Sequence, residues 1–118
     1  MKIIELSMTS DADGDATVSA SSMETGFIEK IVYDFGDLAA NADLVITNES
    51  AISEAILTIT NQGAADNVWY PRTLANKVAD GSAFTDVAEK IFVTGTFKVV
   101  LADGGNAKTG RLLIYLSD

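Results

Sequence analysis

Three aspartates at alternate positions are the first side chains that could carry out chemistry. Asp11, Asp13 and Asp15 lie around Gly14 in a segment of small residues. Hard cations such as Ca²⁺ prefer clustered carboxylates, so these three residues are calcium candidates. The match to the helix–loop–helix calcium motif is poor, because the twelfth position counted from Asp11 is Ser22, where the motif has glutamate. Since Asp and Gly are also common in turns, we interpret the segment as a solvated turn and keep calcium as the alternative.

A glycine-rich segment, residues 104–110, places Lys108 and Thr109 behind a pair of glycines, as a phosphate-binding loop does. The interval from the glycines to Lys108 is too short for that motif. A phosphate loop also joins a strand to a helix, whereas strand-like runs flank this segment on both sides. We therefore predict a turn here and no nucleotide cofactor.

The residue types that are missing restrict the chemistry further. The chain contains neither histidine nor cysteine. Their absence removes the commonest general base, the commonest transition-metal ligand, disulfides and thiolate sites. With 17 acidic residues, some pair of carboxylates will lie at a catalytic distance by chance, and no serine has a recognisable partner base. The sequence predicts a non-enzymatic protein without a cofactor.

The most distinctive cluster is Trp69-Tyr70-Pro71-Arg72. Trp, Tyr and Arg are enriched at the energetic centres of protein interfaces, and aromatic planes also stack on sugars. The same residues could instead be a core tryptophan and a strand end that Pro71 stops. Three interpretations stay open, namely core packing, a subunit interface and a ligand platform. We predict interface contacts for this cluster and for Phe84 in the segment that follows it.

The secondary-structure elements that position these candidate residues are predicted to be short β-strands. A chain of 118 residues with 47% apolar and 21% charged residues is typical of one globular domain, residues 1–118. Turn signals recur about every ten residues, and no long helical period interrupts them. This pattern predicts an all-β fold, an antiparallel two-sheet β-sandwich of jelly-roll or Greek-key type with about eight strands. Strands are expected over 2–9, 16–23, 27–35, 44–47, 56–60, 67–70, 88–94, 96–101 and 111–116.

Local patterns give more specific expectations. The last two strands are predicted to form a hairpin around the glycine-rich segment 102–110. Alternation in the run 27–35 places Phe27 on the same face as Ile31 and Tyr33, with Glu29 interrupting that face. Residues 73–86 are expected to be a long contact loop with at most one helical turn, and residues 37–43 a loop or helical turn. Gly95 is expected to mark a break or bulge, and the strand at 16–23 a sheet edge.

The charge balance indicates which partners are disfavoured. The net charge is −9, from 17 acidic and 8 basic residues. Such a surface repels nucleic-acid phosphates and anionic lipid, so we expect no direct binding to nucleic acid or membrane. Residues 1–6 lack the apolar run of a secretory signal, and no segment reaches the ~20 apolar residues of a membrane span, so neither is expected.

The Trp69-Tyr70-Pro71-Arg72 cluster, followed later by residues 99–110, resembles small structural proteins encoded among the head genes of tailed bacteriophages. The resemblance extends loosely from Gly26 to the end of the chain. It implies a β-rich protein without cofactor or catalytic residues that attaches to an icosahedral shell as decoration or cement. The implied partners are the major capsid protein and copies of the chain itself, with a trimer favoured. The implied location is the capsid surface of the virion, with an N-terminal docking arm at about residues 1–25.

Composition is consistent with that expectation. The apolar content is high for a small domain, so neighbouring molecules are expected to cover part of the apolar surface. The function that the resemblance implies is a virion structural protein that binds the capsid exterior and stabilises the shell as a homo-oligomer. One alternative is a tail, neck or fibre component of the same virion. Another is a carbohydrate-binding module that uses Trp69 and Tyr70 as a stacking platform.

Overall fold

The computed structural model describes all of residues 1–118, and every regular element in it is a β-strand. The ten strands pair antiparallel throughout. No helix is long and apolar enough to span a bilayer. The strands are β1 (Lys2–Thr9), β2 (Ala16–Ser19), β3 (Glu24–Asp34), β4 (Asp43–Glu49), β5 (Ser53–Ile59), β6 (Asn67–Trp69), β7 (Arg72–Asn76), β8 (Ala83–Lys90), β9 (Phe92–Ala102) and β10 (Thr109–Ser117).

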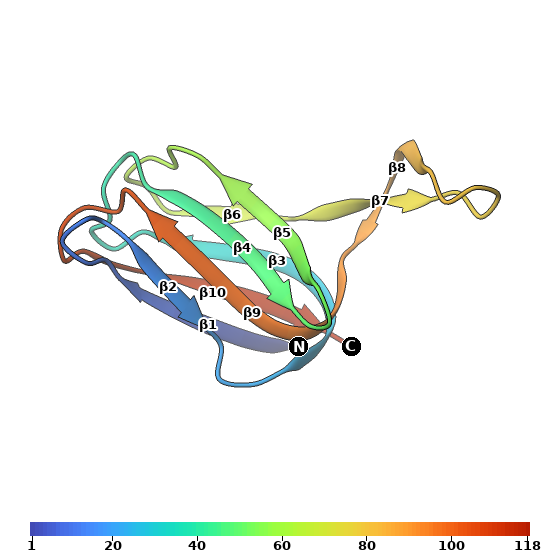
Figure 1. Cartoon of the computed structure of the whole chain (residues 1–118), viewed down its shortest axis with the longest axis horizontal. Helices are drawn as coiled ribbons and strands as arrows, with labels where there is room; N and C mark the ends of the chain where they lie inside the picture. Colours follow the sequence, from blue (N-terminus) through green and yellow to red (C-terminus); the bar gives the residue numbers. More distant parts are fainter.

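Eight of the strands form two layers that face each other (Figure 1). One layer has the order β1-β10-β3-β6, and the other has the order β2-β9-β4-β5. The first residues of β9 pair with the first residues of β3, which joins the two layers at one end. The predicted antiparallel sandwich is confirmed, while the choice between jelly-roll and other Greek-key connections stays a prediction.

The core lies between the layers because side chains alternate along each strand. In β1, β4, β9 and β10, every second side chain is buried and its neighbours face outward. The apolar side chains form one cluster, so the two layers share a single core. The largest fully buried side chains are Leu6, Met8, Ile28, Ile31, Tyr33, Leu38, Leu44, Ile46, Phe97, Leu101, Leu112 and Ile114.

The predicted C-terminal hairpin is wrong. Both strands exist, but β9 pairs with β2, β3 and β4, while β10 pairs with β1 and β3. The segment between them crosses from one layer to the other and packs on the turn at residues 11–15, where Gly104 N–H donates to the Gly14 carbonyl at 2.8 Å. Apolar alternation and glycines predict two strands and a turn, but they do not identify the strands' partners.

A β-bulge in β3 overturns the predicted face of Phe27. Tyr115 pairs with Lys30 and Leu116 pairs with Ile28, so Glu29 is an extra residue opposite β10. Because of this extra residue, the side chains of β3 before the bulge face the opposite way from the faces that simple alternation predicts. Ile28 is therefore buried and Phe27 lies on the outer surface, so Phe27 does not share the core face of the residues after the bulge.

The break or bulge expected at Gly95 is wrong, because β9 continues through this residue, and the chain is interrupted instead at Ile91, between β8 and β9. Gly95 marks a change of partner within the continuous strand. It pairs with Glu24 of β3, and the next residue, Thr96, pairs with Glu49 of β4. A Cβ atom on Gly95 would lie 2.4 Å from both the Asn48 side-chain oxygen and the Glu49 carbonyl oxygen. Glycine is therefore required by close packing at the position where β9 passes from one layer to the other.

The segment expected to be a long loop, residues 73–86, is instead most of a two-stranded hairpin. β7 and β8 pair with each other and project from one end of the sandwich (Figure 1). We call residues 72–90 the arm. Its strands were missed because nearly all of its side chains are exposed, so no buried face imposes an alternating pattern.

Three further predictions concern the strand at 16–23, the segment 37–43 and the N-terminal residues 1–25. Only Ala16–Ser19 of the predicted strand 16–23 is extended, and it is a sheet edge, as expected. Residues 37–43 contain turns and no helix. Residues 1–25 contribute β1, β2 and the start of β3 to the sandwich, so a docking role for them stays a prediction about their exposed faces.

We predict that Gly95→Ala lowers the free energy of unfolding by about 3 kcal/mol, because the new methyl group would clash with the backbone of Glu49 and the buried side chain of Asn48. Gly63→Ala is the control. Gly63 has a φ of 88° but no atom within reach of an added Cβ, so its loss should be about 1 kcal/mol. Urea titration followed by tryptophan fluorescence measures both, and equal losses would contradict the packing account.

Candidate functional site

The bulge residue Glu29 holds the base of the arm. Its carboxylate accepts hydrogen bonds from the Lys90 ammonium at 2.9 Å and from the Ser117 hydroxyl. The Arg72 guanidinium donates to the carbonyl oxygens of Ile28 and Glu29, both at 3.4 Å. Arg72 and Lys90 are paired across the arm. The bulge therefore contacts both strands of the arm at the position where they leave the sandwich.

These contacts also change the acidity of Glu29. The hydrogen bond from Ser117, followed by the hydrogen bond from Lys90, holds the pKa of the Glu29 carboxyl below its usual value of 4.5. The ionised form is therefore the form that the base of the arm stabilises.

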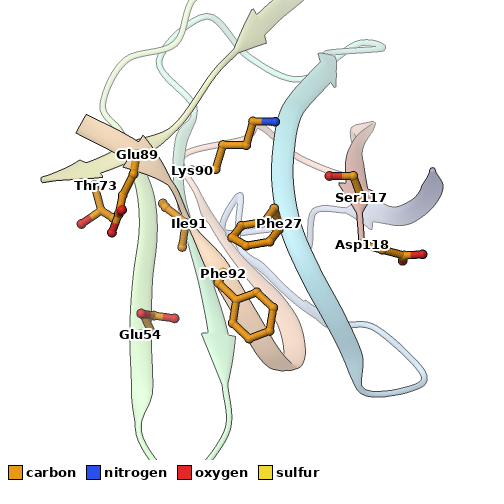
Figure 2. A pocket seen from close by; sticks show the side chains of 9 residues that line it. All are labelled: Phe27, Glu54, Thr73, Glu89, Lys90, Ile91, Phe92, Ser117 and Asp118. Atoms are coloured by element: carbon orange, nitrogen blue, oxygen red, sulfur yellow. The ribbon is translucent and has the colours of Figure 1, made fainter. Parts of the chain in front are cut away.

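A groove of about 660 Å³ lies beside this base (Figure 2). Its centre contains the rings of Phe27 and Phe92, which meet edge to face with centroids 5.0 Å apart. Both rings are exposed, at 38% and 49%. The full lining is Phe27, Glu54, Thr73, Glu89, Lys90, Ile91, Phe92, Ser117 and Asp118.

Unpaired carboxylates surround the aromatic pair. Glu54, Glu89 and Asp118 form no ion pair, whereas the charge of Lys90 is paired with Glu29. In Figure 2, Glu54 and Glu89 lie on one side of the two rings and Asp118 lies on the other. The groove is therefore suited to an apolar group that carries a positive charge.

The arm exposes apolar side chains along its length. Leu74 pairs with Ala88, and Phe84 lies on β8 beyond an irregularity in the pairing of the two strands. The Lys77 ammonium lies 5.9 Å from the centroid of the Phe84 ring and forms no ion pair. The exposed large apolar residues of the arm are Leu74, Val78, Phe84 and Val87.

The arm also differs from the sandwich in charge. It carries as many basic as acidic residues, so its net charge is zero and the whole charge of −9 belongs to residues outside it. The charged residues of the arm are Arg72, Lys77, Asp80, Asp86, Glu89 and Lys90.

The predicted interface residues have different environments. Trp69 is half-buried and stacks on Tyr33, with ring centroids 5.6 Å apart and planes 24° apart. Pro71 is buried, whereas Tyr70 is 62% exposed. Arg72 binds the bulge, and Phe84 lies on the arm. Core packing therefore accounts for Trp69, and an interface role stays a prediction for all five residues, including Tyr70 and Phe84.

The three aspartates form the turn expected of them. The Asp11 carboxylate accepts the backbone N–H groups of Asp13 at 2.9 Å and Asp15 at 3.0 Å. No group of three acidic side chains in the chain is arranged to hold a metal ion. The structure therefore gives the calcium alternative no support.

Sequence reasoning missed the groove and the base of the arm. The available signal was Glu29, a charged residue inside a run of apolar alternation. Its partners are far away in sequence, with Lys90 61 positions and Ser117 88 positions along the chain. Only the tertiary structure could bring them together.

Comparisons with known proteins identify no family. No protein-family model and no curated protein matches the chain. A crystal structure of FLHE superimposes with a TM-score of 0.49 at 9% identity, covering 99% of this chain and 97% of that chain. A structure of infectious bursal disease virus, Gx strain, gives a TM-score of 0.30 at 12% identity, covering 98% of this chain and 37% of that chain. Neither similarity is close enough to indicate a function.

We predict that Trp69→Ala lowers the free energy of unfolding by about 2 kcal/mol, because it removes a half-buried ring from Tyr33. Tyr70→Ala is the matched control and should change stability by less than about 0.5 kcal/mol, since Tyr70 is largely exposed. Denaturant unfolding monitored by circular dichroism compares the two. A greater loss in the Tyr70 variant would contradict this assignment.

We predict that Glu29→Gln is less stable than the wild type near neutral pH and that the difference disappears in acid. A carboxyl whose folded-state pKa is lowered stabilises the fold above its unfolded pKa of 4.5. That stabilisation is lost as the pH falls through the lower folded-state value. Thermal melts from about pH 6 to about pH 3 should show the two melting temperatures converging. Ser117→Ala should show a smaller change in the same direction, and a constant difference across this range would argue against the pKa shift.

Proposed function

We propose that this chain is a non-enzymatic structural protein of a bacteriophage virion that binds the capsid exterior and stabilises the shell as a homo-oligomer. The observation that carries this proposal is the arm. It lies outside the sandwich, has no net charge and leaves four large apolar side chains exposed. Such a surface is typical of a contact with another protein.

The sequence supports the shell as the partner. The Trp69–Arg72 cluster and residues 99–110 resemble small structural proteins from phage head genes. Pro71 lies directly before β7 and Arg72 is its first residue, so this cluster is continuous with the arm. The major capsid protein is accordingly the proposed binding partner, and the capsid surface is the proposed location.

The carbohydrate-binding alternative has less support from the geometry. A sugar platform needs exposed aromatic faces, and Trp69 is half-buried against Tyr33. Tyr70 alone is largely exposed. A tail, neck or fibre location uses the same kind of contact and is distinguished by experiment.

Co-sedimentation with genome-filled heads of the phage that encodes the chain tests the proposal. The wild type should pellet with heads, and the double variant Leu74→Ser/Val87→Ser should bind about tenfold or more weakly, since it removes two exposed apolar contacts from the arm. Val100→Ser, an exposed apolar position on the sandwich, is the control.

Three results would count against the proposal. Wild-type protein that stays in the supernatant with heads but pellets with isolated tails would favour the tail alternative. Binding that only Val100→Ser weakens would place the contact on the sandwich and remove the role of the arm. Retention on a glycan array with no affinity for heads would favour the sugar-binding alternative.

A further inference from the structure

The groove beside Phe27 and Phe92 is not filled by its own arm. Thr73 and Glu89, at the base of the arm, form part of its lining, and the arm then leads away from the sandwich (Figures 1 and 2). The distal part of the arm, residues 76–84, lies beyond that base. The two rings therefore stay exposed in a single copy of the chain, and their outer faces are accessible to another molecule.

The composition of the groove specifies what would fit. Two aromatic rings provide an apolar surface, and three unpaired carboxylates give the rim a negative charge. An aromatic or aliphatic side chain next to a free cation satisfies both features, because the cation pairs with the carboxylates while the apolar group covers the rings.

The distal part of the arm presents that combination. Lys77 lies over the ring of Phe84 and has no ion-pair partner. Phe84 keeps 36% of its surface exposed, and Val78 beside Lys77 is fully exposed. The same segment contains Asp80, whose carboxylate accepts the Ser82 backbone N–H at 3.0 Å and the Ser82 hydroxyl at 2.7 Å. The complementarity to the groove therefore rests on the Lys77 ammonium and the exposed apolar side chains, and not on the net charge of the segment.

We propose that the arm of one copy docks into this groove on a second copy. Phe84 packs on the Phe27–Phe92 pair, and Lys77 lies among Glu54, Glu89 and Asp118. This inference deepens the proposed function, because it identifies how copies join each other, but the contact itself requires no shell.

The charge distribution favours this mode of self-association over contact between sandwiches. Two sandwiches that each carry −9 repel one another, whereas a neutral arm can approach an acidic surface without that penalty. Since arm and groove are different surfaces of the same chain, the contact is heterologous. A closed ring, or a reciprocal exchange between two copies, uses every arm.

Light scattering coupled to size-exclusion chromatography tests the contact on the full chain. The wild type should form a discrete oligomer as its concentration rises. Lys77→Glu on the arm and Phe92→Ala in the groove should each weaken association roughly tenfold or more. Lys108→Glu is the control, because it makes the same charge change in the loop between β9 and β10, away from the arm. Thermal melts establish that all variants are folded.

A mixing experiment separates docking from a general effect of charge. Lys77→Glu keeps an intact groove, and Phe92→Ala keeps an intact arm. Each should be a monomer alone, and an equimolar mixture should form a heterodimer in native mass spectrometry. Raising the salt concentration from about 0.05 to about 0.5 M should weaken the wild-type oligomer, because screening reduces the attraction of Lys77 to the carboxylates.

Two results would overturn the inference. One is a wild type that is monomeric at every concentration, and the other is an oligomer that persists in both variants. A monomer that still co-sediments with heads would refute arm docking and the homo-oligomer, and would leave standing only the proposed binding to the shell. An oligomer that both variants disrupt but that does not co-sediment with heads would support arm docking and count against the proposed function.

Discussion

The contacts of Glu29 connect the parts of this molecule that matter for its surface. One extra residue in β3 places a carboxylate where Lys90 of the arm and Ser117 of the last strand can both donate to it. The same bulge presents two carbonyl oxygens to Arg72. It also turns Phe27 outward, which supplies one ring of the groove. The direction of the arm and the floor of the groove thus depend on one local irregularity.

Local physics was enough to predict the layered all-β fold. Alternating apolar residues in β1, β4 and β10 mark strands that are half-buried, and glycine-rich or aspartate-rich segments mark the turns between them. Partner choice is different, because it depends on contacts between distant residues. Val99 of β9, for example, pairs with Val18 of β2 and with Ile46 of β4. The apolar pattern of β9 would be the same if this strand formed a hairpin with β10, so the pattern does not identify the partners.

The candidate site was less predictable than the fold for a related reason. The arm has almost no buried side chains, so its sequence shows no alternation of apolar and polar residues. The groove collects residues from β3, β5, β7, β8, β9 and the C-terminal end, and no short motif contains them. Trp69 and Tyr70 stood out by residue type alone. Trp69 is the last residue of β6 and packs inward, whereas Tyr70 lies just beyond that strand and is exposed.

The way in which the arm is attached has a mechanical consequence. Its strands bond to each other, and its polar bonds to the sandwich are confined to the base around Glu29. No side chain of the arm belongs to the core, so the tilt of the arm is set by these few contacts at its base and by the core residue Ile91 that follows it. In the proposed assembly, a contact that tilts at its base would let joined copies follow a surface whose curvature varies from place to place.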